Sequence, residues 1–314
     1  DATAKLGRLA ADEHPRVRLE AVRALAQIPT LAALDLALSV LDRPMDPFLD
    51  YALWLTVNDL SAPWLAAVKA GQVDFAGRDA QLAFVLKALP SAQTGEVLGR
   101  ILGGKPLPRD GSGPWIELIG SAGTPAELQQ LFAQVTAGGF DRPAALRALA
   151  ALGEASRLRK ARPSAGSESL GSVLNSADAD VRLAALPLAG EWRTAALAPQ
   201  LLAVAGNAAL TAPERSAALT ALREIGDETA RRGLRELAEK SSDPSVRRDA
   251  VVALASLAQP TALPSMLAAL KAATPDEAPV LWRALLGVKG AGALLAKELP
   301  QSPLPAPVAL AGVR

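Results

Sequence analysis

One short sequence recurs along this chain, and it constrains the fold more than any other feature. Its sharpest copy lies in residues 242–257, and residues 13–25 and 178–186 contain two others. In the sharpest copy, Asp243 and Pro244 break the preceding helix and begin the next one. A unit repeated within one chain is typical of a stacked array, in which each repeat buries its apolar face against its neighbours.

The residues that follow each turn have the spacing of an amphipathic helix. In the sharpest copy, Val246, Ala250, Val251 and Leu254 make one apolar stripe. The stripe aligns nine helices through Val22, Leu53, Leu86, Ile116, Leu146, Leu186, Leu219, Val251 and Leu285. Most steps between these positions are in the low thirties, and a period of that size with two helices per unit predicts short helical hairpins.

The recurring sequence Asp-Pro-x-Val-Arg-x-x-Ala-Val-x-Ala-Leu resembles the second half of a HEAT repeat. In that family a first helix, a short Asp/Pro turn and a second helix form one hairpin, and hairpins stack into a solenoid. The resemblance implies an all-α fold, a HEAT-type α-solenoid of roughly nine to ten helical hairpins. It implies a fold and no particular activity.

We expect a single array over residues 1–314, because a solenoid grows without one central core. Both ends read as interrupted helical sequence, so we expect a fragment of a longer protein. Two stretches break the repeat: residues 103–114 are rich in glycine and proline, and residues 156–169 are basic and then rich in serine and glycine. We interpret both stretches as surface insertions.

Composition excludes several classes of site. The chain has no cysteine and one histidine, His14, which argues against metal sites, thiol chemistry and covalently attached haem. No stretch has a recognisable catalytic pattern, so we expect no enzyme activity and no cofactor. The 33 Lys and Arg residues balance the 32 Asp and Glu residues, which argues against specific nucleic-acid binding. No apolar run is long enough to span a membrane.

The densest run of positive charge lies in the second insertion. Arg157, Arg159, Lys160 and Arg162 fall within six residues. They are candidates for contact with an anionic partner, such as a phosphate, a lipid headgroup or an acidic protein. The alternative is that they form the solvated flank of a loop, which is the commoner role of a charge run.

Three tryptophans are the other candidates for partner contact. Trp54, Trp192 and Trp282 fall in predicted second helices, which line the concave side of HEAT arrays. An exposed tryptophan there would be a binding anchor. The alternative is burial between hairpins.

Arginines also recur near the start of the second helices: Arg18, Arg182, Arg215 and Arg247. They are either a basic ladder for an acidic ligand or structural residues. The HEAT resemblance implies the second role, in which each arginine donates hydrogen bonds to turn carbonyls or pairs with an acidic residue of the adjoining hairpin.

Two stretches, residues 41–54 and 64–71, carry a narrower resemblance. They are similar to the HEAT segments of large exported proteins of planctomycete-type bacteria. In that family a β-propeller domain resembling sugar dehydrogenases precedes the array, and a c-type haem domain follows it. This resemblance implies a non-catalytic spacer that works outside the cytoplasm.

Together these features predict a scaffold that binds or positions protein partners or flanking domains, possible redox domains among them. Two alternatives use similar repeats: a nucleic-acid-binding protein of the HEAT-like DNA glycosylase type, and a protein resembling the phycobilin lyases. The glycosylase type requires a basic concave groove, whereas these second helices carry Glu20, Asp50, Glu117, Glu191 and Glu224 as well as arginines. A test of bilin binding would separate the lyase alternative.

Overall fold

A computed structural model describes residues 2–73, 78–257 and 259–312. Within these residues the chain folds into twenty α-helices and three short 3-10 helices, with no β-strand. The helices fall into two compact units, residues 1–164 and 165–314. Each unit contains five consecutive pairs of α-helices. The prediction of an all-α fold with roughly nine to ten hairpins is therefore confirmed.

The first unit consists of five pairs of helices, which range in length from 8 to 18 residues. They are α1 (Ala2–Ala10), α2 (Pro15–Leu25), α3 (Leu31–Leu38), α4 (Pro47–Asp59), α5 (Ser61–Lys69), α6 (Asp79–Ala88), α7 (Ser91–Leu102), α8 (Trp115–Ala122), α9 (Pro125–Thr136) and α10 (Arg142–Arg159). One 3-10 helix, η1 (Ser39–Asp42), extends α3.

The second unit continues the same order with ten further helices. They are α11 (Leu170–Leu174), α12 (Ala179–Glu191), α13 (Ala198–Gly206), α14 (Ala212–Ile225), α15 (Glu228–Lys240), α16 (Pro244–Leu257), α17 (Gln259–Ala272), α18 (Ala278–Leu286), α19 (Ala291–Glu298) and α20 (Ala306–Ala311). The 3-10 helices η2 (Ser167–Ser169) and η3 (Ala195–Leu197) precede α11 and α13.

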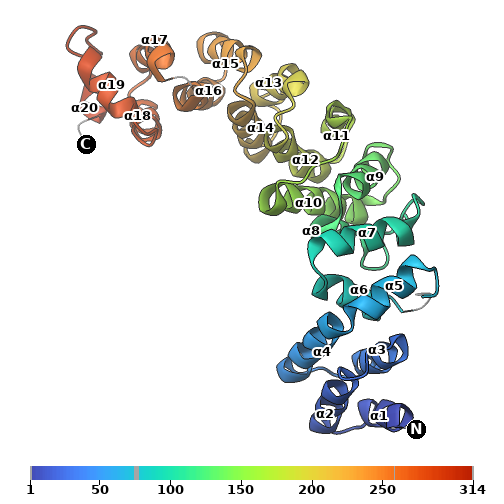
Figure 1. The fold of residues 1–314 in the computed structure, drawn as a ribbon. Coiled ribbons are helices and arrows are strands. Elements are labelled where there is room, and N and C mark those ends of the chain that lie inside the picture. Colours follow the sequence, from blue (N-terminus) through green and yellow to red (C-terminus); the bar gives the residue numbers. More distant parts are fainter. Residues whose placement is uncertain (1, 74–77, 258, 313–314) are drawn as a thin grey trace. The chain divides into compact units, whose positions relative to one another are not determined.

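Each unit has two layers of helices (Figure 1). In the first unit, α1, α3, α5, α7 and α9 contact one another in sequence, and α2, α4, α6, α8 and α10 form the other layer. In the second unit, α13, α15, α17 and α19 form one layer, and α12, α14, α16, α18 and α20 form the other. We call the even-numbered helices the second-helix layer of their unit.

The aligned apolar positions lie in the second helices, as predicted, and nearly all of them are buried. The exception is Leu146 in α10, which is only partly buried, whereas Ala148 and Leu149 are buried in its place. In α16 the stripe that includes Ala250 and Leu254 is fully buried. Each large apolar side chain buried in this way contributes about 1.5–3 kcal/mol.

Side chains at the turns fix where many of the helices begin. Asp46 accepts hydrogen bonds from the backbone N–H groups of Phe48 and Leu49 and so caps α4. Thr124 and Glu127 form a capping box at the start of α9. These side chains satisfy backbone donors that a helix leaves unpaired in its first turn.

The stretch predicted as a second insertion needs a correction. Helix α10 continues to Arg159, so the irregular backbone begins at Lys160 and not at residue 156. Lys160 ends the helix in the left-handed conformation, with φ of 55°. The boundary between the two compact units lies a few residues later, between Ser164 and Ala165. Residues 103–114 connect α7 to α8 without regular structure.

Candidate functional site

The most unusual surface in the described residues lies on α4. Phe48 is 77% exposed, Tyr51 61%, Trp54 42% and Leu55 41%. These four residues, which we call the α4 face, recur at helical spacing on one side of the helix. The opposite side of α4 buries Leu49, Leu53 and Val57, so the helix carries apolar residues on both sides. Exposed apolar residues gathered on one side of a helix are typical of interaction surfaces.

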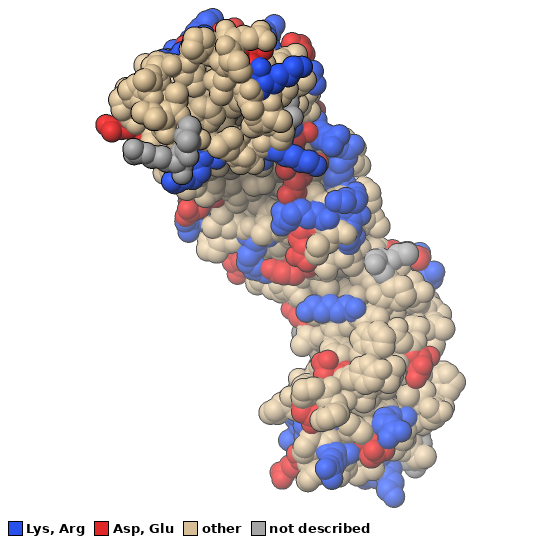
Figure 2. All heavy atoms as spheres, turned by 90° about the vertical axis from the view of Figure 1, so that its left-hand side faces the viewer, with Lys and Arg blue, Asp and Glu red and all other residues tan. Residues whose placement is uncertain are grey.

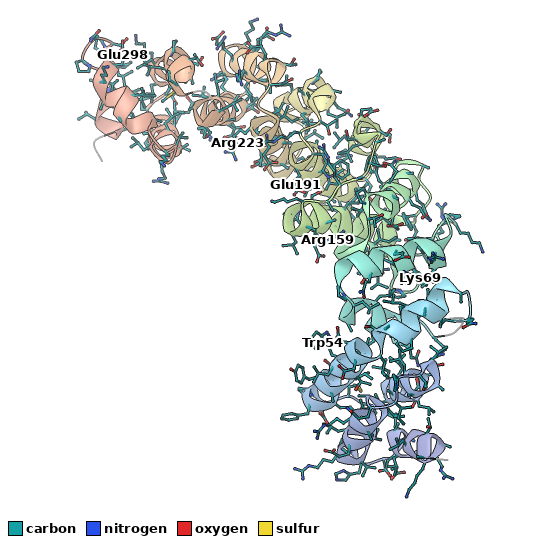
Figure 3. All side chains as sticks on the ribbon, in the orientation of Figure 1. Trp54, Lys69, Arg159, Glu191, Arg223 and Glu298 are labelled. Atoms are coloured by element: carbon teal, nitrogen blue, oxygen red, sulfur yellow. The ribbon has the colours of Figure 1, made fainter. Side chains whose placement is uncertain are left out.

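The two aromatic rings of the α4 face are stacked on one another. The ring centroids of Tyr51 and Trp54 are 6.1 Å apart, and the ring planes differ by 10°. Offset stacking of aromatic rings is favourable. The side-chain amide of Asn58 donates a hydrogen bond of 2.8 Å to the carbonyl of Trp54 one turn earlier. Figure 3 shows Trp54 on α4, within the second-helix layer of the first unit. The stacked pair therefore presents its rings in a preferred arrangement before any partner binds.

The charges on α4 are all negative. Residues 44–68 contain Asp46, Asp50 and Asp59 and no lysine, arginine or histidine. Asp50 and Asp59 are exposed, and they lie near opposite ends of the helix. On the adjacent α2, exposed Arg23 pairs with Glu20 at 3.2 Å. In Figure 2 the lower part of the molecule, which is the first unit, is mostly uncharged surface with isolated charged residues.

The sequence identified Trp54 but missed the rest of the α4 face. A signal was present, because the segment Phe-Leu-Asp-Tyr-Ala-Leu-Trp-Leu is apolar around the whole helix and not along one stripe. A surface helix that needs only one buried side rarely has this pattern.

The other two candidate tryptophans are buried. Trp192 is 3% exposed and Trp282 is 7% exposed, so neither ring is available as a surface anchor, and this corrects the prediction for both residues. The indole N–H of Trp282 donates a 2.8 Å hydrogen bond to the carbonyl of Val308 in α20. Gly312 leaves the space that this indole occupies, because a Cβ there would lie 2.7 Å from the ring.

The four candidate cations do not share one role. Arg159 is partly buried, and its guanidinium turns back to the end of α8 (Figure 3). Its Nε donates to the carbonyl of Gly120 at 3.2 Å, and its Nη2 donates to the carbonyl of Gly123 at 2.9 Å. Burial lowers the pKa of Arg159, and the charge of Glu154 partly offsets this effect. Arg159 therefore serves to cap α8.

The remaining three cations, Arg157, Lys160 and Arg162, are exposed. Arg157 lies in the last turn of α10, where its guanidinium covers Gly153. Contact of these three residues with an anionic partner stays a prediction.

The recurring arginines bind the turns of the array. Arg18 donates to the carbonyls of Asp12 and Glu13, both at 3.0 Å, and to the carbonyl of Pro44 in the next turn at 2.7 Å. Arg215 donates to the carbonyl of Leu210 at 2.5 Å. The structural role that the HEAT resemblance implied is thus the observed one.

Two of these arginines lie at junctions of similar sequence but different geometry. Arg182 donates through Nη1 to the carbonyl of Ser176 at 2.7 Å and through Nη2 to Glu214 at 2.7 Å. Arg247 likewise donates to the carbonyl of Ser241 at 2.8 Å. Among the described residues, however, no ion pair joins Arg247 to Glu277, the residue that corresponds to Glu214. A groove between the α15–α16 and α17–α18 turns is lined by both side chains.

The carboxylates at these junctions differ in their surroundings. Burial raises the pKa of Glu214, but hydrogen bonds from Thr211 and Arg182 outweigh it and hold the pKa below its ordinary value. A hydrogen bond from the backbone of Thr274 lowers the pKa of Glu277. Glu224 in α14 differs, because burial and the charge of Glu191 in α12 raise its pKa. Figure 1 labels both helices.

The part of the chain that the structure describes also bears on metal binding and membrane crossing. It contains no group of three or more His, Cys, Asp or Glu residues that could hold a metal ion. The imidazole of His14 caps α2 by accepting a hydrogen bond from the backbone of Arg16 at 3.3 Å. No single described helix is long and apolar enough to cross a membrane. Helices α18 and α19 reach that length and hydropathy only when taken together, and the pair is bent by 119°.

Comparison with known families agrees with this architecture. Residues 210–279, which contain α14 to α17, match the family of HEAT repeats. The matched residues are thus HEAT repeats, and the described residues of the chain have the two-layered architecture of an α-solenoid. Proteins of this class generally serve as scaffolds for protein interaction. A comparison with curated proteins gives no match.

Proposed function

We propose that the protein is a non-catalytic scaffold whose α4 face binds a protein partner. The exposure of Phe48, Tyr51, Trp54 and Leu55 on one helix carries this proposal. Large aromatic residues dominate the binding energy of protein interfaces, because they bury much area with few rotatable bonds. Stacking of Tyr51 on Trp54 reduces the entropy that ordering these side chains would cost on binding.

The narrower resemblance adds a second element to the proposal. In an exported protein with a dehydrogenase-like propeller and a haem domain, the array holds the two domains near each other, and any redox chemistry belongs to those domains. Within this arrangement, the partner of the α4 face is a segment of a flanking domain or of a separate protein.

A photo-crosslinking amino acid placed at residue 51 tests the proposal in cells that make the full-length protein. We expect one defined protein adduct, identified by mass spectrometry, that disappears when Trp54→Ser is added. The matched control places the same amino acid at residue 158, because Leu158 is 74% exposed on α10. Identical adducts at both positions, or none at residue 51, would contradict the proposal.

A further inference from the structure

Trp54 lies in a small cluster on the α4 face that combines two aromatic rings with a carboxylate. Asp50 precedes Trp54 by four residues, and Tyr51 precedes it by three. Residues at these spacings are neighbours on a helix, with about 5–6 Å between their Cβ atoms. Side chains of a helix lean towards its N-terminus, so the Trp54 ring leans over the turn that carries Asp50 and Tyr51. Its stacking on Tyr51 agrees with this direction, and we call the three residues the Trp54 cluster.

The carboxylate of the Trp54 cluster is exposed, and within the described residues no hydrogen bond or ion pair reaches the Asp50 side chain. Helix α4 itself has no lysine, arginine or histidine. On the neighbouring α2, Arg23 pairs with Glu20 at 3.2 Å. At the start of α6, the other neighbour, Arg78 pairs with Asp35 at 3.0 Å. The Asp50 charge is therefore open to a cation from a partner.

We infer that the Trp54 cluster binds an arginine side chain of the partner, an inference that rests on the proposed function. The face of an aromatic ring attracts cations, and tryptophan attracts them most strongly. A guanidinium group is planar, so it stacks on the Trp54 ring and at the same time donates N–H groups to the Asp50 carboxylate. A lysine ammonium group is compact and strongly hydrated, so it gains less from the same pair of contacts.

The rest of the α4 face determines what surrounds that arginine. Phe48 precedes Tyr51 by three residues and Leu55 follows it by four, so both lie beside the Trp54 cluster on the same side of the helix. Both are exposed and apolar. Apolar residues of the partner next to its arginine would cover them, and removal of water from the contact strengthens the attraction between cation and ring. The partner segment is therefore apolar around one arginine.

Asp59 provides a matched control within the same helix. It is exposed and carries the same charge as Asp50, but it follows Asp50 by nine residues. Nine residues of α-helix make about two and a half turns, so the two side chains project from opposite sides of the axis. The residues three and four positions before Asp59 are Thr56 and Leu55, so no aromatic ring lies beside it. Only Asp50 combines a carboxylate with the rings.

Three synthetic peptides serve as probes. They share one sequence of leucine and serine and differ at a single central position, which is arginine, lysine or citrulline, the neutral planar analogue of arginine. Fluorescence anisotropy measures their affinity for the full chain. We expect the arginine peptide to bind about 10-fold more tightly than the citrulline peptide, the combined effect of a cation–ring contact and one exposed ion pair. The lysine peptide should lie between the two.

Variants assign the preference for arginine to the Trp54 cluster. Trp54→Leu keeps an apolar side chain but removes the ring, so the preference should fall to about 3-fold or less. Asp50→Asn should also reduce it, to about 3-fold, because the ion pair is lost and the rings remain. Asp59→Asn removes the same charge elsewhere on the helix and should leave the preference unchanged. Circular dichroism verifies that every variant is folded.

Four results would overturn the inference. They are equal binding of the arginine and citrulline peptides, failure of the arginine peptide to bind, and equal loss of the preference in Asp50→Asn and Asp59→Asn. The fourth is a dimer, detected by light scattering, that Trp54→Leu dissociates, because the occupant is then a second copy of this chain.

The crosslink at residue 51 separates failure of this inference from failure of the proposed function. A crosslinked partner whose contact segment lacks arginine would refute the inference and retain the function. Absence of a defined adduct at residue 51 refutes the function itself.

Discussion

In the second unit, two junctions between neighbouring hairpins have similar sequences but different side-chain contacts. At the first, Arg182 bridges its own turn and Glu214, and both side chains are largely buried, with 19% and 3% exposed. At the second, the hydrogen bonds of Arg247 within the described residues go to its own turn, and both Arg247 and Glu277 line a groove. One arginine position can therefore either join two repeats or serve one repeat alone.

The difference follows from where each following helix begins. Thr211 is the N-cap of α14, so Glu214 lies in the first helical turn and points its carboxylate to both Thr211 and Arg182. Thr274 and Glu277 also bond to one another, but α18 begins later, with Glu277 at its N-cap position. A shift of three residues in the helix start thus separates the acid from the arginine.

The largest expected effect is that of removing the acid. Glu214→Ala leaves Arg182 partly buried without its carboxylate and removes the capping box, so it should lower the free energy of unfolding by about 3–5 kcal/mol. Glu277→Ala removes a more exposed turn contact and should cost about 1 kcal/mol or less. Urea unfolding of the full chain, with hydrogen exchange to locate the change, measures both. Equal costs would abolish the distinction between the two junctions.

A double-mutant cycle isolates the arginine–acid interaction from other effects. Coupling between Arg182→Ala and Glu214→Ala should be about 1–3 kcal/mol, as is typical of residues in one buried network. The corresponding cycle at Arg247 and Glu277 should give less than about 0.5 kcal/mol, since no ion pair joins them. A coupling of similar size at both junctions would show that the groove closes in solution.

Acid should weaken the two junctions unequally. Because the pKa values of Glu214 and Glu277 are both lowered from 4.5, each contributes stability that is complete above pH 4.5 and is lost as the pH falls through the folded pKa. Glu214→Gln should remove more of this pH dependence than Glu277→Gln, because Arg182 bonds directly to Glu214, whereas Arg247 and Arg248 act on Glu277 only through their charges. Thermal unfolding between pH 3 and pH 6, roughly the range around the ordinary pKa of glutamate, checks this order.

The smallest expected effect is that of Arg247→Lys. A lysine can still donate to the carbonyl of Ser241, so the loss should be about 0.5 kcal/mol or less. Arg182→Lys should cost more, because a single ammonium group cannot reproduce the separate bonds to Ser176 and Glu214. Comparison of the two melting temperatures gives the result, and a larger loss at Arg247 would contradict it.

The periodic stripe made the architecture predictable, because burial of Val22, Ala250 and Val251 depends on local helical spacing. The capping box of Thr124 and Glu127 is likewise recognisable from the sequence, because it depends on two residues within one helical turn. The burial of Trp192 and Trp282 could not be predicted in this way, because burial of a ring depends on neighbouring helices that are distant in sequence. The later start of α18, by contrast, has a local signal, because Pro279 follows the Thr-x-x-Glu of residues 274–277 and proline is best tolerated in the first turn of a helix.

The arginine contacts also have a mechanical consequence. In an array whose repeats touch only their neighbours, a pulling force is transmitted through each junction in turn, and the junction with the weakest contacts extends first. The bond from Arg182 to Glu214 should act as a stiff link, whereas no described ion pair joins Arg247 to Glu277 at the α16–α18 junction, which should therefore be the more compliant one. Under load, strain should therefore concentrate at the groove beside Arg247 and spare the repeats on either side.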